Sequence, residues 1–254
     1  MADTGKSDLP TVVFVHGFLG CGRLPLIDVA FFRGADALMA GVGAPYLMPS
    51  LPRGGNVETR AAALANVLER SEARRLVLIG HSMGGLDSRL VAARMDPRRW
   101  VKAVVTLGTP HRGSPLADHA LAGKGALATY ARWRGWRPAL ADLSPAGAAR
   151  FNDAVRDRPD VRYLSYAGAR PEAETPLWAR RFVRAIAERE GDNDGQVSVA
   201  SARWGDFRGV VRADHWELIG WNLGLARPEV GRPYPHLALL KAAVEDGLAA
   251  ATGS

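Results

Sequence analysis

The stretch "RLVLIGHSMGGLDSRLVAARM", Arg75 to Met95, joins a short apolar run to an amphipathic one through a glycine-rich turn. "LVLI" is typical of a buried strand, and "LDSRLVAARM" has the spacing of a helix. Between them, "GHSMGG" fits Gly-x-Ser-x-Gly with Ser82 at its centre. In a strand, turn and helix context this pattern exposes a serine hydroxyl for nucleophilic attack. Ser82 could instead only cap the helix, but a cap does not need glycines on both sides, so we interpret it as a nucleophile.

The rest of the chain alternates strands with helices. Short apolar runs predict buried strands at 11–15, 75–80, 101–108, 161–168 and 209–213, and helical patterns cover 27–40, 56–74, 84–95, 144–156, 175–190 and 235–250. This alternation predicts an α/β fold with a mostly parallel central sheet and helices on both faces. With no repeat and no linker, residues 1–254 are expected to form one domain. Ligands of such sheets bind at the carboxyl ends of the strands.

One segment breaks the alternation. Residues 114–142 mix glycines with aromatic side chains and carry no strand pattern. Such an insertion near the strand ends is typical of a helical lid or cap over a binding site. A fixed structural excursion is the alternative interpretation.

Composition narrows the class of protein. The formal net charge of +7 invites a nucleic-acid function, but the 33 basic residues are scattered without a basic run, which favours a solvated surface and no nucleic-acid partner. Cys21 is the only cysteine, so no internal disulfide is expected. The chain shows neither an export signal nor an apolar run of membrane-spanning length, and we therefore expect a cytoplasmic protein, a secreted mature form being the alternative.

A serine hydroxyl is a poor nucleophile at neutral pH, so the chain must also supply a base. His215, in "RADHWELIG", directly follows a predicted strand late in the chain and is the predicted base. The other histidines have different expected places, namely the glycine turns (His16, His81), a strand end that could line the cleft (His111), the 114–142 segment (His119) and the last helix (His236).

The base needs an acid that orients it, and "EGDNDGQVSV" provides two candidates. Asn-Asp-Gly favours a tight turn that can hold one carboxylate rigidly, so we prefer Asp194 to Asp192. Asp206 and Asp214 are weaker alternatives. The chain order Ser82, Asp194, His215 is that of the α/β-hydrolase fold.

Attack on a carbonyl also needs two donors for the oxygen that becomes negative. The N–H of Met83 begins the helix after the nucleophile and gains from the helix's positive end. The second donor is expected in "HGFLG", after the first strand, where Phe18 can direct its N–H into the cleft and Gly17 allows close approach. Three apolar side chains, Leu19, Trp216 and Leu218, are predicted to line an acyl pocket.

The chain resembles the true lipases of the α/β-hydrolase superfamily, the bacterial family I triacylglycerol lipases and their esterase relatives. The resemblance runs over roughly residues 10–225, through "VVFVHGFLG", "LVLIGHSMGGLDSRLVAARMDP", "VTLGTPHRGSPLAD", "DNDGQVSVASARWG" and "HWELIGW". It implies the same nucleophile, acid, base and oxyanion donors, and it makes the 114–142 segment the lid that opens over lipid. It also implies a structural calcium, which the family binds through an aspartate two residues after the catalytic histidine. This chain has Glu217 at that position, which puts the ion in doubt.

The resulting hypothesis is a serine carboxylic ester hydrolase, an esterase or lipase, that cleaves uncharged apolar esters or acylglycerols without an organic cofactor. The expected partners are a small ester or lipid and, transiently, a lipid surface; the oligomeric state stays open. An acyltransferase or a polyester depolymerase would use the same triad. A noncatalytic binding protein on the hydrolase fold is a further alternative, which an intact set of Ser82, Asp194 and His215 does not favour.

Overall fold

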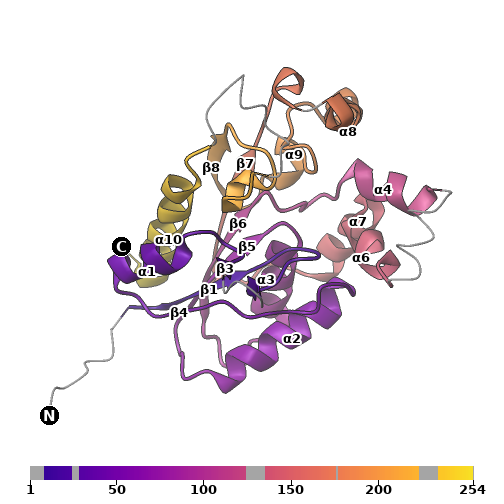
Figure 1. Cartoon of the computed structure of the whole chain (residues 1–254). Coiled ribbons are helices and arrows are strands. Elements are labelled where there is room, and N and C mark those ends of the chain that lie inside the picture. Colours follow the sequence, from indigo (N-terminus) through magenta and orange to yellow (C-terminus); the bar gives the residue numbers. More distant parts are fainter. Residues whose placement is uncertain (1–8, 25–28, 124–134, 176, 223–233, 254) are drawn as a thin grey trace, which may run out of the picture.

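The centre of the structure is a six-stranded sheet in which all neighbours are parallel (Figure 1). The computed structural model describes residues 9–24, 29–123, 135–175, 177–222 and 234–253. The strand order is β4-β1-β5-β6-β7-β8, with bounds β1 Thr11–Val15, β4 Tyr46–Leu47, β5 Leu76–His81, β6 Val101–Leu107, β7 Arg162–Gly168 and β8 Asp206–Val211. A separate antiparallel pair joins β2 (Arg23–Leu24) to β3 (Val29–Ala30).

Helices cover both faces of the sheet, as the alternating pattern predicts. On one face lie α1 (Ala35–Val42) and α10 (His236–Thr252), and on the other α2 (Val57–Arg70) and α3 (Met83–Arg94) (Figure 1). The remaining elements are α4 (Pro115–Ala122), α6 (Arg137–Leu143), α7 (Pro145–Ala154), η1 (Glu172–Glu174), α8 (Leu177–Glu190), α9 (Val199–Ala202) and η2 (Glu217–Ile219). In the part of the chain described, no helix combines the length and the apolar character needed to cross a membrane.

Strand β1 shows why the apolar runs form the middle of the sheet. Val12 and Phe14 pack into the core on the α10 side, whereas Val13 and Val15 pack into the core on the α2 and α3 side. Successive side chains of a strand point to opposite faces, so a strand covered on both faces must be apolar at every position. All of β1 is accordingly buried.

Two predicted elements differ from the observed ones. The helix expected over 27–40 begins only at Ala35, because Val29–Ala30 form β3 and Gly34 has φ +73°, which interrupts helical geometry; residues 27 and 28 lie outside the described part. The last strand begins earlier than predicted, at Asp206. Strand β4 is only two residues long, too short for a periodicity signal.

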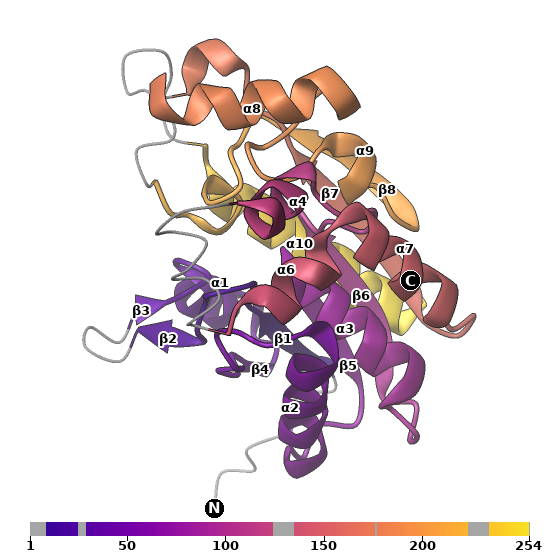
Figure 2. The same cartoon turned by 90° about the vertical axis from the view of Figure 1, so that its right-hand side faces the viewer.

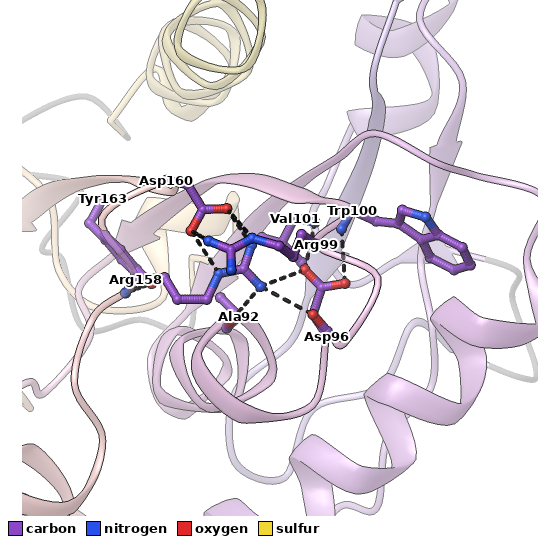
Figure 3. Close-up of polar contacts among 8 residues, drawn as sticks. All are labelled: Ala92, Asp96, Arg99, Trp100, Val101, Arg158, Asp160 and Tyr163. Carbon is purple, nitrogen blue, oxygen red and sulfur yellow. Dashed lines mark hydrogen bonds and ion pairs between the residues drawn. The ribbon is translucent and has the colours of Figure 1, made fainter.

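The end of α3 farthest from Ser82 is held by a network of polar contacts (Figure 3). Asp96 accepts the N–H groups of Trp100 and Val101 at 2.9 Å each, and Arg158 donates to the Asp96 carboxylate at 3.0 Å and to the Ala92 carbonyl at the same distance. Hydrogen bonds from Arg158 and Arg99 also hold the pKa of Asp160 well below its usual range. The network ties α3, the helix that follows the Ser82 turn, to the starts of β6 and β7.

Candidate active site

The chemistry-bearing residues meet at a cavity of about 330 Å³ at the carboxyl ends of the strands. Ser82 and His215 both line it. Most of the other lining side chains are apolar and come from the turn after β1, from α4 and from α6, among them Phe18, Leu19, Leu116, Ala117, Ala120, Leu140 and Leu143. Figure 2 shows α4 and α6 side by side at this end of the molecule. The described parts of the 114–142 segment therefore line the cavity, and residues 124–134 lie outside the described residues.

Ser82 sits on a strained turn between β5 and α3. Its φ of 55° and ψ of −130° are unusual for a residue with a side chain and cost on the order of 1–3 kcal/mol. The backbone is held there by the bond from Ser82 N to Leu107 O (3.0 Å) and by the Thr109 hydroxyl, which donates to Ser82 O (2.8 Å). The Ser82 side chain makes no capping hydrogen bond to α3, so the helix-cap interpretation does not apply.

The glycines around Ser82 allow backbone segments to approach more closely than any side chain permits. A Cβ on Gly17 would lie 2.8 Å from the Cβ of Ser82. A Cβ on Gly84 would lie 2.2 Å from the carbonyl oxygen of Val15, and one on Gly80 would lie 2.6 Å from Gly85. The turn after β1 is therefore pressed directly against the serine turn.

His215 and Asp194 form a buried pair beside the cavity. His215 Nδ1 lies 2.7 Å from Asp194 Oδ2, and the side chains are 2% and 1% exposed. The other oxygen, Asp194 Oδ1, accepts the N–H groups of Gln196 (2.9 Å) and Val197 (2.7 Å). The Asp194 carboxylate is thus held at both oxygens, and a proton on Nδ1 leaves the lone pair of His215 on Nε2.

The alternative acids occupy different positions. Asp192 and Asp206 are exposed. Asp214 is buried, but its Oδ1 accepts the N–H groups of Trp216 and Glu217 and so shapes the turn that carries His215. The structure thus separates Asp194 from Asp192 by burial, which the sequence pattern could not do.

The other histidines have structural contacts. His16 Nε2 accepts the N–H of Leu51 (2.9 Å), and burial lowers the pKa of His16 to about 4. His81 Nε2 lies 2.9 Å from His215 O, and burial lowers the His81 pKa well below its usual value. His111 is fully buried against Trp204 and is not among the residues that line the cavity. His119 lies 3.0 Å from Pro115 O, and His236 lies 3.0 Å from Arg33 O.

Of the two predicted oxyanion donors, Met83 directly follows Ser82 in the chain and Phe18 lines the same cavity as Ser82. Met83 is the first residue of α3, where N–H groups have no partner within the helix. Phe18 lines the cavity, and its ring packs edge-on against Trp136 with centroids 5.7 Å apart. Within the described residues neither N–H has a backbone or side-chain acceptor.

Two of the three predicted pocket residues line the cavity, and the third lies in the core. Leu19 and Trp216 line the cavity. Leu218 does not: it is fully buried in the core, because the η2 turn directs it away from the cavity. Phe31 also lines the cavity and contacts Trp216 with ring centroids 6.2 Å apart. Sequence reasoning missed Phe31, since it lies in an irregular segment without a motif. It also missed Thr109, which the polar strand end "LGTPHRGS" could have indicated.

Glu217 is bound to an arginine, and its surroundings do not fit a calcium ion. Arg170 donates to Glu217 Oε1 at 2.7 Å and to Oε2 at 2.9 Å, and the N–H of Asp214 donates to Oε2 at 2.9 Å. Both side chains of the ion pair are at most 4% exposed. A guanidinium thus occupies the place where a cation would bind, and the described residues contain no group of three or more acidic, histidine or cysteine side chains placed to hold a metal.

The parallel sheet, the serine at the turn after β5 and the histidine and aspartate on later loops define an α/β hydrolase. Residues 62–172 match the family described as the PGAP1-like alpha/beta domain. Triacylglycerol lipase 2 of Saccharomyces cerevisiae is 30% identical over 213 residues, which cover 78% of this chain and 64% of the yeast protein. A triacylglycerol lipase of Pseudarthrobacter phenanthrenivorans is 36% identical over 124 residues, 46% of this chain and 38% of that protein.

Solved structures show the same fold. The mature lipase BlEst2 of Bacillus licheniformis has a TM-score of 0.68 and 25% identity, covering 85% of this chain and 88% of its own. The metagenomic carboxyl esterase MGS0156 has a TM-score of 0.71 and 24% identity, covering 96% of this chain and 77% of its own. The protein therefore has the α/β-hydrolase fold and is similar in sequence and structure to lipases and esterases. The chain spans less than two thirds of the length of the yeast and the Pseudarthrobacter lipases, 64% and 38% respectively.

Proposed function

We propose that this protein is a serine carboxylic ester hydrolase that cleaves uncharged esters with apolar acyl groups, including acylglycerols. The observation that carries the proposal is the buried contact of 2.7 Å between His215 Nδ1 and Asp194 Oδ2, beside an apolar cavity that His215 shares with Ser82. A binding protein would not need a histidine oriented by a buried carboxylate next to a serine held in a strained turn.

In the proposed mechanism, His215 Nε2 takes the proton of the Ser82 hydroxyl as Ser82 Oγ attacks the ester carbonyl. Asp194 holds the Nδ1–H tautomer and stabilises the imidazolium that forms. The N–H groups of Phe18 and Met83 donate to the oxyanion. The alcohol leaves with a proton from His215, and water activated by the same histidine then releases the acid from the acyl-serine.

The lining of the cavity supports the apolar substrate class. Lining residues from α4 and α6 are leucine and alanine, such as Leu116, Ala120 and Leu140. Among the described residues that line it, none carries an aspartate, glutamate, lysine or arginine side chain. We propose that α4 and α6 form the cover of the acyl site within a single domain.

The test compares Ser82→Ala with wild type on p-nitrophenyl esters from acetyl to palmitoyl and on a triglyceride emulsion. Turnover is expected to fall by about 10⁴-fold or more, with folding unchanged. The matched control is Ser88→Ala, on the same helix, where a buried hydroxyl donates to the Gly84 carbonyl at 2.7 Å and faces no substrate. This control is expected to keep its turnover.

Labelling by a fluorophosphonate distinguishes the alternatives. Wild type is expected to react and Ser82→Ala to be inert. Hydrolysis that persists in Ser82→Ala would refute the assignment of the nucleophile. A wild type that neither reacts nor hydrolyses any ester would favour a noncatalytic protein.

A further inference from the structure

Arg60, in the first turn of α2, is fully buried and donates to three different segments. Its Nε lies 2.8 Å from Asp87 Oδ2, its Nη1 lies 2.6 Å from Pro52 O, and its Nη2 lies 2.6 Å from His16 O. Arg60 and Asp87 are both 0% exposed. A buried ion pair is weak evidence for stability alone, since well-packed apolar residues often serve as well. The positions of its partners indicate a more specific role.

The partners of Arg60 belong to the two elements that carry the proposed oxyanion donors. His16 lies two residues before Phe18. Asp87 lies four residues after Met83, one turn along α3 and on the same side of the helix. One guanidinium therefore bonds to the turn that presents one donor and to the helix that presents the other.

We infer that Arg60 is a positioning residue for the oxyanion hole, which it aligns by fixing the turn after β1 relative to α3. This inference rests on the proposed ester hydrolase function. Two N–H groups stabilise an oxyanion only if both lie about 2.7–3.1 Å from the same oxygen. The guanidinium is planar and rigid, so its hydrogen bonds fix the spacing between the turn after β1 and α3. A flexible or apolar side chain of the same volume does not fix this spacing.

The surroundings of the turn explain why it needs such support. Leu19 has a positive φ of 60°, which is unfavourable for a leucine. The 50–53 segment holds the turn through the bonds from Leu51 N to His16 Nε2 (2.9 Å) and from Leu19 N to Arg53 O (2.9 Å). Arg60 binds this segment through the Pro52 carbonyl and connects it to Asp87 on α3. Arg60 therefore fixes the position of the turn after β1 relative to α3.

The experiment compares Arg60→Met and Arg60→Lys with a control at another buried arginine. Arg89→Met is matched because Arg89 is also fully buried and bonds to Asp157 (3.2 Å) and Asn152 (2.9 Å), neither of which belongs to the turn after β1. Each variant is assayed at a temperature at which circular dichroism shows it folded. The readouts are kcat and KM on a p-nitrophenyl ester, and Ki for an alkyl trifluoromethyl ketone, whose hemiketal places an anionic oxygen in the hole.

Arg60→Met is expected to lower kcat by about 10²-fold, the size associated with loss or misplacement of one oxyanion donor, with KM nearly unchanged. Ki for the ketone should rise by a similar factor, because the analogue depends on the same donors as the transition state. Arg60→Lys keeps the charge and part of the hydrogen bonding and should lose about tenfold. Arg89→Met should lose stability but keep kcat within about threefold.

Three results would overturn the inference: a folded Arg60→Met with wild-type kcat, a loss of kcat without a rise in Ki, or an equal loss of kcat in Arg89→Met. If Arg60→Met does not fold, Arg60→Lys decides by the same kcat and Ki criteria. Failure of the proposed function gives a different result, because then wild type itself neither hydrolyses esters nor reacts with a fluorophosphonate.

Discussion

Replacing Arg170 by methionine is expected to destabilise the turn that carries His215. The Arg170 side chain binds both oxygens of Glu217 and also Glu174 Oε2 (2.8 Å), while its N–H donates to Asn193 O (2.9 Å), next to Asp194. Arg170→Met would keep the backbone bond but leave the Glu217 carboxylate buried, 2% exposed, without its cation. Removing one partner of such a pair costs about 3–5 kcal/mol, a large part of the roughly 5–15 kcal/mol that stabilises a typical protein.

Urea unfolding at pH 7 measures this difference. The matched control is Arg208→Met, because Arg208 also binds a carboxylate with two bonds, to Asp246 at 2.8 and 2.9 Å, but is 40% exposed. An exposed pair contributes at most about 1 kcal/mol. A loss in Arg170→Met no larger than that in Arg208→Met would refute the reasoning.

The pH dependence gives a second check on the same variant. Burial alone would raise the pKa of Glu174, but hydrogen bonds from Arg170 and Arg212 outweigh it and lower the pKa below its usual value. A lowered carboxyl pKa stabilises the folded state above the unfolded pKa of about 4.3, and this stabilisation is lost as the pH falls through the folded value. The difference in the free energy of unfolding between wild type and Arg170→Met should therefore become smaller below about pH 4.3.

Because a guanidinium occupies the cation position beside Glu217, calcium should have no structural role there. EDTA and added calcium are expected to leave the melting temperature and ester turnover of wild type unchanged. A melting temperature that rises with calcium and falls with EDTA would contradict this expectation. Loss of the same calcium effect in a Glu217→Gln variant would then place the ion at Glu217.

Three further variants, and one control variant, test the contacts around the site. Burial and the charge of Arg60 lower the pKa of His16 to about 4. Below pH 6.5 the unfolded chain takes up a proton on His16 and the folded protein does not, so wild type loses about 2 kcal/mol of folding stability at pH 5. In urea titrations at pH 7 and 5, His16→Gln should lack this part of the loss. Ser82→Gly should abolish turnover yet raise the free energy of unfolding by about 1 kcal/mol by relieving the strained φ, which calorimetry can detect. Gly84→Ala should lower the free energy of unfolding by about 2 kcal/mol or more, because the new Cβ would meet Val15 O at 2.2 Å. The control is Gly41→Ala, where a new Cβ has nothing within 4 Å, and this variant should be as stable as wild type or more stable.

The class of fold and the position of the Ser82 turn could be predicted from the residue pattern alone. The apolar runs at 11–15, 75–80 and 101–108 are strands of the sheet, and the glycines around Ser82 mark the turn between β5 and α3. These features depend on residues that are close in the chain, so periodicity and turn chemistry predict them. Single residues without a local pattern were less predictable: Asp194 could only be preferred to Asp192, and Leu218 was expected in the cavity rather than in the core.

The pairing of distant side chains around the site becomes visible only in the folded structure. Arg60 and Asp87 are 27 residues apart, and Arg170 and Glu217 are 47 residues apart, yet each pair is buried and hydrogen-bonded. Sequence alone presents them as four charged residues among many, because nothing in the neighbouring residues shows that a charge will be buried or which partner will meet it. The contribution of each ion pair to stability depends on its burial and its geometry, and both are set only when the helices pack against the sheet.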